Sequence, residues 1–394
     1  MEGILAPCSG RSAGEMIAAQ TASGPQPGMA ATGWRLRPET NDLLTLDFLR
    51  FAASLGIVYY HLNEFFFAPE RRQAIIAAQG FGMFVDLFFI ISGYVLAHVY
   101  IGRLRTAGDY GKFLWRRVAR LYPLHLVVLG INIAIWWGLL QRAGSENAPS
   151  FDPLCILHTA LLVQEYLDCG SPYSFNGVTW SISIEMGLYV LFPLFMLLAL
   201  RGARWIGAFS AVTLAVAVLL LRDHDGWGHL PPILRGLTGF SFGIFLFRIR
   251  GRLPDLRDRG VVSLVLLLAL FPLLLLPAPD WLRMATILAL ATSAVASDLH
   301  RNLNPVVLRL APLGQLTYAI YIWHRAVILV LMNAIADKML GGAPLALAAM
   351  AVMSVATIFA LSYLGYFLIE TPARRVLTRI TRRRDTKRNK EFST

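Results

Sequence analysis

The chain has 394 residues, of which 56% are hydrophobic and only 15% are charged, with a mean hydropathy of +0.56. A soluble domain carries charge on roughly 25% of its residues, so this composition excludes an ordinary soluble protein and predicts an all-α protein that crosses a membrane several times. The formal net charge of +12 does not indicate nucleic acid, because the basic residues lie between apolar segments and in the C-terminal tail, where they suit cytoplasmic loops and anionic lipid.

The two ends of the chain differ in composition from its middle. Residues 1–42 are rich in Gly, Ala, Ser and Pro and lack the regions of a signal peptide, so we expect a disordered N-terminal tail. A translation start further along the chain, at Met16 or Met29, explains the same composition equally well. We predict that residues 43–372 form one transmembrane domain and residues 373–394 a basic cytoplasmic tail.

Apolar segments of the length needed to cross a bilayer follow one another through this domain. We predict about ten membrane-spanning helices in one bundle, at residues 46–67, 81–101, 121–140, 178–200, 204–221, 232–247, 261–277, 283–298, 316–336 and 345–369. Pro123 and Pro272 fall inside two of these segments, where neighbouring helices are expected to satisfy the carbonyl groups that proline leaves free.

The distribution of basic residues predicts the orientation. If the N-terminus is cytoplasmic and ten helices alternate, most of the 36 Lys and Arg residues fall in inside segments. The outside loops then hold Arg71, Arg72, Arg142, Arg222, Arg235, Arg283 and Lys338. Both termini are therefore predicted to be cytoplasmic, with the protein in the inner, or plasma, membrane.

The first predicted helix carries two ionisable residues on one stripe. Arg50 and His61 are eleven positions apart, which places them on nearly the same face, roughly 16 Å apart along the axis. An arginine inside a bilayer costs at least ~2.5–3.5 kcal/mol, so the pair indicates a functional site in which His61 takes up and returns a proton. The simpler interpretations are a histidine bonded to a neighbouring helix and an arginine that extends to the cytoplasmic surface.

The second predicted helix contains Asp86, followed by Ser92 and Gly93. A buried carboxylate needs a partner, and we expect Arg50 or His61 of the first helix to supply it. The small Ser-Gly pair allows a ligand or another helix to approach closely, and a simple packing seam explains it at least as well.

A cluster of arginines precedes the third predicted helix. Arg116, Arg117 and Arg120 lie three or four positions apart on a short amphipathic helix that we expect in the cytoplasmic loop. Guanidinium groups bind phosphate oxygens through paired hydrogen bonds, so the cluster suits the phosphates of a cofactor. On charge alone, binding of lipid headgroups explains the cluster better.

The fourth predicted helix begins with Trp180. Ser181, Glu185 and Tyr189 then step by four and share one face. A carboxylate at this depth lines a wet cavity or pairs with a cation, so Glu185 is either a functional residue or one half of a salt bridge that joins two helices.

Two motifs lie near the C-terminus. Tyr321 and His324 are neighbours on one face of the ninth predicted helix, beside Arg325. Glu370 and Pro372 close the tenth, where a simple helix stop at the cytoplasmic surface explains them.

Cys155 and Cys169 lie in the longest predicted outside loop, and in an oxidising compartment a disulfide between them would contribute ~3 kcal/mol. Two cysteines in a loop are weak evidence, so the bridged and free states both stay open. The sequence contains no spacing typical of metal ligands and no nucleotide-binding motif, so we expect no metal and no permanently bound cofactor.

Taken together, these segments resemble the acyltransferase type 3 family, membrane O-acyltransferases that modify cell-envelope and exported polysaccharides. The resemblance covers about residues 43–376 and is carried, in order, by LDFLRFAASLGIVYYH, VDLFFIISGYV, FLWRRVARLYP, WSISIE, YAIYIWH and IETPARR. Four family motifs fall on residues of this chain: Arg-x10-His on Arg50 and His61, Phe-Phe-x-x-Ser-Gly on Phe88, Phe89, Ser92 and Gly93, Arg-x-x-Arg on Arg117 and Arg120, and the tryptophan-led acidic motif on Trp180, Ser181 and Glu185. Longer members carry a serine-esterase-like domain after the tenth helix, and its absence here leads us to expect one domain that transfers the group itself or with a separate partner.

The resemblance implies that an acyl group, most often acetyl, passes from cytoplasmic acyl-CoA to a hydroxyl of an extracytoplasmic or lipid-linked glycan. Arg116, Arg117 and Arg120 would hold the CoA phosphates, and His61 would act as general base or carry the acyl group briefly. The expected catalytic residues are His61, Arg50 and Glu185, and the expected substrate-binding residues are Asp86, Ser92, Trp180, Ser181, Tyr321 and His324. Expected partners are acyl-CoA, the glycan and membrane lipids.

Two other functions fit the same pattern. A transporter or flippase of glycan or lipid intermediates would also line a path with charges, although it needs no phosphate clamp beside a base. A sensor or scaffold would use the basic tail to bind anionic lipid. Peptidoglycan, O-antigen, exopolysaccharide, an oligosaccharide signal and a lipid-linked sugar are equally compatible acceptors, and the sequence leaves acyl length and oligomeric state open.

Overall fold

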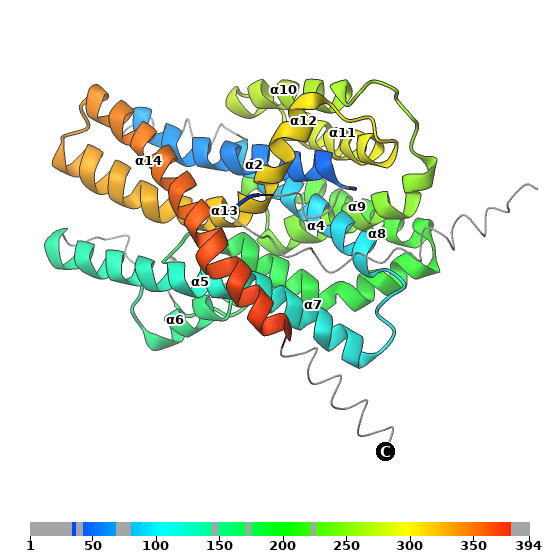
Figure 1. The fold of residues 1–394 in the computed structure, drawn as a ribbon, viewed down its shortest axis with the longest axis horizontal. Helices are drawn as coiled ribbons and strands as arrows, with labels where there is room; N and C mark the ends of the chain where they lie inside the picture. Colours follow the sequence, from blue (N-terminus) through cyan, green and yellow to red (C-terminus); the bar gives the residue numbers. More distant parts are fainter. Residues whose placement is uncertain are drawn as a thin grey trace, which may run out of the picture.

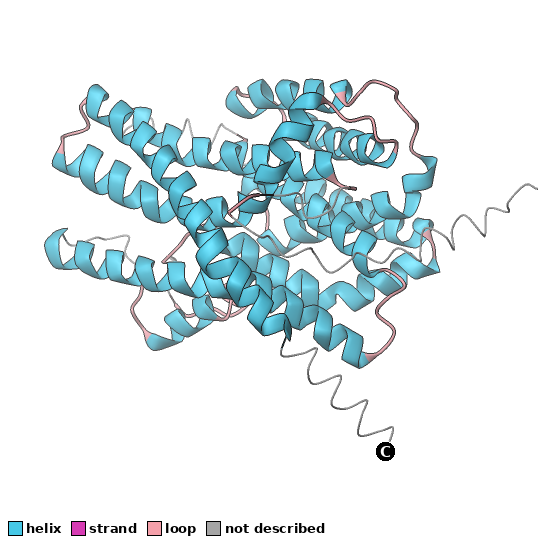
Figure 2. Cartoon of the chain, in the orientation of Figure 1, coloured by secondary structure: helices cyan, strands magenta, loops and turns pink. Residues whose placement is uncertain are grey.

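The computed structural model describes residues 34–36, 42–67, 80–143, 149–170, 175–221 and 226–379, and all regular structure in these ranges is helical (Figure 1). The long helices, coloured in Figure 2, are α2 (Leu44–Asn63), α4 (Phe84–Tyr100), α5 (Ala107–Ala143), α7 (Thr179–Arg201), α8 (Ala203–Leu220), α9 (Pro232–Ile249), α10 (Val261–Leu275), α11 (Asp280–Leu299), α13 (Thr317–Ile328) and α14 (Pro344–Gly365). Short helices α6 (Pro153–Ala160) and α12 (Pro305–Leu310) join them. Most of the predicted N-terminal tail and residues 380–394 of the basic tail lie outside the described residues.

Every predicted membrane segment contains one of the long helices. In the described part of the chain, eight helices are long and apolar enough to cross a membrane. The other two are α10, which has 15 residues, and α2, whose mean hydropathy is lowered by Asp47, Arg50 and His61. The chain is therefore a multi-pass membrane protein, while the count of ten and the cytoplasmic position of both termini stay predictions.

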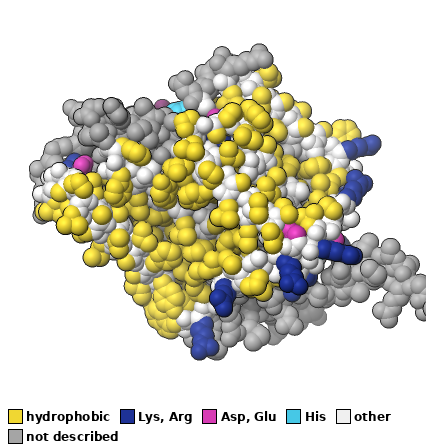
Figure 3. All heavy atoms as spheres, turned by 90° about the horizontal axis from the view of Figure 1, so that it is seen from above, with side chains coloured by type: hydrophobic (Ala, Val, Ile, Leu, Met, Phe, Trp, Pro, Cys, Tyr) yellow, Lys and Arg dark blue, Asp and Glu magenta, His cyan; other side chains and the backbone are white. Residues whose placement is uncertain are grey.

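The surface is apolar over a wide area (Figure 3). Leu268 on α10 and Val352 on α14 are each 72% exposed, and Val212 on α8 is 60% exposed. Side chains of this kind over neighbouring turns suit contact with lipid rather than water. Most of the Lys and Arg side chains visible in the same view lie along its lower and right-hand edges.

Helices α4 and α9 pack against each other through glycine. A Cβ atom at Gly93 would collide with the carbonyl oxygen of Phe240, and one at Gly243 would collide with that of Ile90. Gly93 is therefore part of a packing seam, because only glycine lets these two backbones approach so closely.

Helix α2 begins at a buried carboxylate. The two oxygens of Asp298, on α11, accept hydrogen bonds from the backbone N–H groups of Thr45 (2.7 Å) and Leu46 (3.1 Å). These N–H groups have no partner within their own helix, so Asp298 fixes the position of the helix that carries Arg50 and His61.

Two helix boundaries differ from the predictions. Helix α5 is continuous from Ala107 to Ala143, so Arg116, Arg117 and Arg120 lie on the same helix as the third predicted span rather than on a separate short one. Pro372 does not stop the last helix, which continues to residue 379. A π-helical segment at Tyr366–Glu370 precedes the proline, and its wider turn moves away the carbonyl groups that the proline ring would meet.

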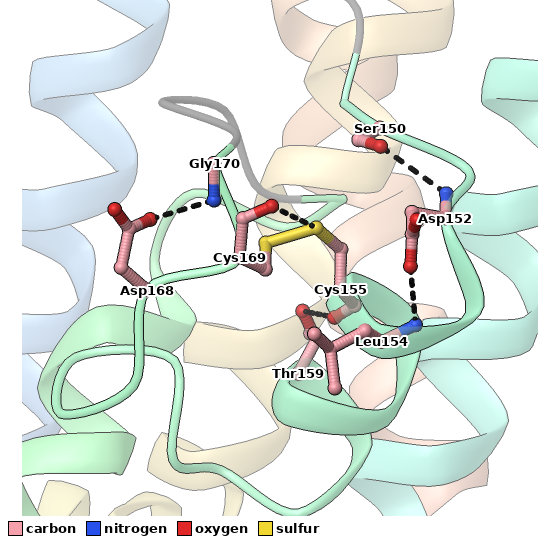
Figure 4. The surroundings of a disulfide bond; sticks show 8 residues. All are labelled: Ser150, Asp152, Leu154, Cys155, Thr159, Asp168, Cys169 and Gly170. Carbon is pink, nitrogen blue, oxygen red and sulfur yellow. Dashed lines mark hydrogen bonds between the residues drawn. A yellow bond between two sulfur atoms is a disulfide. The ribbon is translucent and has the colours of Figure 1, made fainter.

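A disulfide joins Cys155 of α6 to Cys169 in the loop that leads to α7 (Figure 4). The Asp152 side chain caps α6 by accepting a hydrogen bond from the N–H of Leu154 at 2.7 Å. The structure thus shows the bridged state of the two that the sequence left open.

Candidate active site

Two cavities meet inside the helix bundle. The first, which we call the arginine cavity, has a volume of about 110 Å³, and the second, the histidine cavity, about 360 Å³. Val85 and Tyr321 line both, so the two cavities adjoin at these side chains, a boundary that we call the neck. Sites for small molecules typically measure ~300–1,000 Å³, so the histidine cavity is within this range and the arginine cavity is below it.

The arginine cavity contains most of the residues that the sequence motifs singled out. They come from α2, α4, α5 and α7, and they are Arg50, Phe88, Phe89, Ser92, Arg117, Arg120, Ser181, Glu185 and Tyr189. His61 and Trp180 of the same motifs line the histidine cavity instead.

Arg117 is the best-placed cation of the basic cluster. One of its Nη atoms donates a hydrogen bond to the Tyr100 hydroxyl at 3.2 Å, and its guanidinium lies 5.5 Å from the centre of that ring. Its buried Nε has no hydrogen-bond partner in the described structure. Arg120 lines the same cavity, whereas Arg116 is exposed and lies outside it. Arg117 and Arg120 can thus face an anion in the cavity, and Arg116 cannot do so in this arrangement.

Arg50 lies in the arginine cavity, away from His61. Its guanidinium is 3.4 Å from a carboxylate oxygen of Asp47, one helical turn earlier, and its side chain is 14% exposed. It does not extend to the surface, so the simple interpretation of an arginine that reaches for lipid headgroups is not what the structure shows.

Glu185 and Ser92 are in direct contact in the lining of the arginine cavity. The Ser92 hydroxyl donates a hydrogen bond to Oε1 of Glu185 at 2.7 Å, which joins α4 to α7. The sequence allowed Glu185 either to line a cavity or to form a salt bridge between two helices. Glu185 lines the arginine cavity, and among the described residues no salt bridge links it to another helix.

Tyr321 is held firmly at the neck. Its hydroxyl lies 2.7 Å from that of Ser181 and 3.1 Å from the carbonyl oxygen of Val178, both on the α7 side. Its ring packs edge-on against Phe88, with the ring centres 5.9 Å apart. Ser181 therefore helps to hold Tyr321 in place where the two cavities adjoin.

His61 lines the histidine cavity together with Trp180, Tyr60 and Arg235. Its Nδ1 is 3.2 Å from Nη1 of Arg325 on α13. The ring of His324 stacks on the His61 ring at a centre-to-centre distance of 5.2 Å and is fully buried. His324 therefore supports His61 from behind and does not line either cavity.

The contact with Arg325 fixes the tautomer of His61. A guanidinium only donates hydrogen bonds, so Nδ1 of His61 must be the acceptor and the hydrogen of the neutral ring sits on Nε2. His61 can accept a proton only when Arg325 releases Nδ1. Glu64 offers the arginine another partner, because its Oε1 lies 3.5 Å from the same Nη1 atom.

The partner of Asp86 is Arg235 of α9, and the prediction that the first helix supplies it is wrong. Nε and Nη2 of Arg235 contact the two oxygens of Asp86 at 3.2 and 2.7 Å, and the indole N–H of Trp227 donates to Asp86 at 3.1 Å. Asp86 is 1% exposed and lines neither cavity. Its carboxylate is fully engaged in joining α4 to α9, which leaves no oxygen directed at a substrate.

Arg235 is a site residue that the sequence analysis missed. It was assigned to an outside loop together with Arg283, but both are buried within the first turns of α9 and α11. The guanidinium of Arg235 lies 5.1 Å from the centre of the Trp180 ring and lines the histidine cavity. The sequence contained a signal that could have identified Arg235, because an arginine at the fourth position of an apolar segment requires a buried partner.

No group of three or more His, Cys, Asp or Glu side chains capable of holding a metal ion occurs in the described ranges. The residues that line the two cavities offer an imidazole at His61, the guanidinium charges of Arg50, Arg117, Arg120 and Arg235, and the hydroxyl groups of Ser92, Ser181 and Tyr321.

Comparison with known proteins shows which proteins this chain resembles. A family model described as an acyltransferase domain matches residues 43–383. The chain is 27% identical over 323 residues to the acyltransferase MdmB of Streptomyces mycarofaciens, covering 74% of this chain and 80% of that protein. It is 30% identical over 190 residues to protein 2 in the picA locus of Rhizobium radiobacter, covering 45% of this chain and 92% of that one.

A third relative is a Bacillus subtilis protein, YrhL, provisionally named as a peptidoglycan O-acetyltransferase. The identity is 24% over 213 residues, which covers 51% of this chain and 32% of that protein. No solved structure matches the chain.

Proposed function

Because the chain belongs to this acyltransferase family and is a membrane O-acyltransferase, we propose that it moves an acyl group from acyl-CoA at the cytoplasmic side to a hydroxyl of a glycan at the other side. The protein would lie in the inner, or plasma, membrane. The acceptor would be an extracytoplasmic or lipid-linked glycan of the cell envelope, the class of molecule named for YrhL.

The arginine cavity is the entry site for the donor in this proposal. Arg117 and Arg120 bind the CoA phosphates, and the unpartnered Nε of Arg117 gives one phosphate oxygen a buried donor. The narrow cavity that continues from these arginines suits the pantetheine arm, and Arg50 further along it stabilises charge on the thioester.

The histidine cavity is the site for the acceptor. The faces of Trp180 and Tyr60 provide flat apolar walls, and His61 lies between them and Arg325. When Arg325 moves to Glu64, Nδ1 of His61 accepts the proton of the glycan hydroxyl. The hydroxyl oxygen then bonds to the thioester carbonyl carbon, the carbon–sulfur bond breaks, and the CoA thiolate receives the proton from His61.

One observation carries this proposal. The phosphate-binding arginines and the histidine lie in separate cavities that touch at Val85 and Tyr321. A donor and an acceptor from opposite sides of a membrane can meet only if their two sites are neighbours, and these cavities adjoin between the proposed donor clamp and the proposed base. A transporter would need neither the clamp nor the base at that junction.

The test supplies radiolabelled acetyl-CoA to membranes that contain the wild type, His61→Ala or the control His300→Gln. His300 lies outside both cavities, where its ring contacts the Leu253 carbonyl. We expect label in envelope glycan with the wild type and the control and at least ~100-fold less with His61→Ala, the size of effect typical of removing a general base. Equal labelling by His61→Ala removes His61 from catalysis, and no labelling by the wild type favours transport without chemistry.

A further inference from the structure

We propose that Val85 and Tyr321 form a sieve that sets the size of the acyl group, with Val85 as the residue that determines specificity. The inference rests on the proposed function, because it takes acyl-CoA as the donor and the arginine cavity as its entry. It goes further in assigning the chain-length limit to one side chain.

The donor would approach the neck with its acyl end first. If the CoA phosphates stay at Arg117 and Arg120, the acyl group is the leading end of the donor, and it must reach the neck before any other part of the molecule does. His61 lies in the cavity beyond the neck. Any acyl group that reacts near His61 therefore enters or crosses the space between Val85 and Tyr321.

Neither side of the neck is free to widen. The Tyr321 ring is fixed by Ser181, by the Val178 carbonyl and by the packing of Phe88. Val85 precedes Asp86, whose ion pair with Arg235 locks that turn of α4 onto α9. Val85 is 4% exposed and Tyr321 7% exposed, so both side chains are closely surrounded by the rest of the protein.

A rigid neck selects by size, because widening it would break these contacts. An acetyl group ends in one methyl group and presents the smallest leading end of any acyl donor larger than formyl. For each added methylene group or branch, the side chains of Val85 and Tyr321 would have to move apart. We therefore expect the sieve to favour acetyl-CoA over longer or branched acyl-CoA.

The test compares two donors in one preparation. Acetyl-CoA and butyryl-CoA are supplied to membranes with the wild type, Val85→Ala, Val85→Leu, and two controls, Val95→Ala and Ile57→Ala. Val95 lines only the arginine cavity and Ile57 only the histidine cavity, so each removes apolar volume on one side of the neck. The measured quantity is the ratio of kcat/KM for butyryl-CoA to that for acetyl-CoA, which does not depend on how much protein is folded.

We expect the wild type to prefer acetyl-CoA. Val85→Ala should raise the ratio at least ~10-fold, about the discrimination that one or two methylene groups provide in an apolar site. Val85→Leu should lower the ratio, and both controls should keep the wild-type value.

An unchanged ratio in Val85→Ala, or the same increase in either control, overturns the sieve while leaving the proposed function intact. A wild type that prefers butyryl-CoA also overturns it. A wild type that uses neither donor overturns the proposed function, and the sieve with it.

Discussion

Arg325 donates a hydrogen bond to Nδ1 of His61 across 3.2 Å, and the same Nη1 atom lies 3.5 Å from Oε1 of Glu64. The guanidinium thus contacts two partners at once, one at the end of α2 and one in the turn Glu64–Phe66 that follows it. While Arg325 donates to His61, the ring nitrogen that could accept a proton is occupied. If Arg325 shifts fully to Glu64, that nitrogen becomes free. We therefore expect Glu64 to influence whether His61 can act as a base.

We predict that Glu64→Gln lowers kcat about 10-fold, because a neutral amide competes less well for Arg325 than a carboxylate does, and ~1.4 kcal/mol corresponds to a factor of ten in rate. KM for acyl-CoA should change little, since Glu64 does not line the arginine cavity. Initial rates of acetyl transfer at varied acetyl-CoA concentration measure both quantities.

Arg325→Leu provides the matched background for this prediction. If Glu64 acts through Arg325, adding Glu64→Gln to Arg325→Leu should cause no further loss, because two residues of one chain of contacts are not additive. A second 10-fold loss in the double variant would show that Glu64 acts on its own.

A second prediction separates two neighbouring arginines. Arg117→Ala should raise KM for acetyl-CoA at least ~10-fold, because a charged hydrogen bond to phosphate contributes ~1.5–3 kcal/mol. Arg116→Ala should leave KM within about twofold, since Arg116 is exposed and lies outside the arginine cavity. Steady-state kinetics with purified protein in detergent or nanodiscs checks both variants, and an equal rise in KM for both would indicate a diffuse surface charge effect instead of a phosphate site.

The sequence predicted the elements and the residue types of the site better than the contacts between them. Helical periodicity and apolar length located α2, α4, α7 and α9, because these are local properties of the chain. The choice of Arg235 rather than Arg50 as the partner of Asp86 depends on how α4 crosses α9, which the Gly93 seam decides and no local pattern reveals.

The division of the site into two cavities was also beyond the sequence. Arg50 and His61 share a stripe of α2, as predicted, yet Arg50 lines the arginine cavity and His61 the histidine cavity. The neck between them depends on Tyr321 of α13, whose position is set by hydrogen bonds to residues more than a hundred positions away. Resemblance to a family identified the residues, and only the structure shows which of them face each other.

The buried Asp86–Arg235 pair leads to a third prediction, about stability. Asp86→Asn should lower the free energy of unfolding by ~3–5 kcal/mol, because it leaves the Arg235 charge buried without its partner. Replacing both residues, as in Asp86→Leu with Arg235→Met, should recover most of the loss, since two apolar side chains leave no charge unpaired. Thermal unfolding in detergent, followed by tryptophan fluorescence, measures these changes.

The exposed pair of Asp42 with Arg301 supplies the control. Its charged atoms are 3.7 Å apart and the Asp42 side chain is 71% exposed, so Asp42→Asn should change stability by less than ~1 kcal/mol. If the double replacement at Asp86 and Arg235 proves as unstable as Asp86→Asn, the pair would be holding α4 to α9 by specific geometry rather than by cancelling charge.

A fourth prediction concerns orientation, because the proposed entry of acyl-CoA depends on which end of the bundle faces the cytoplasm. The disulfide of Cys155 and Cys169 precedes α7, and Arg257 follows α9, so three membrane-spanning helices separate the two regions. They should therefore lie on opposite sides, with the disulfide outside. In a Cys8→Ser background, a membrane-impermeant maleimide applied to intact cells should label Cys155 and Cys169 only after reduction. A cysteine placed at residue 257 should react only after the cells are opened. Labelling of both regions from the outside would contradict the prediction that three membrane-spanning helices separate them. Labelling of residue 257 alone would show that the protein has the opposite orientation, with the arginine cavity facing away from cytoplasmic CoA.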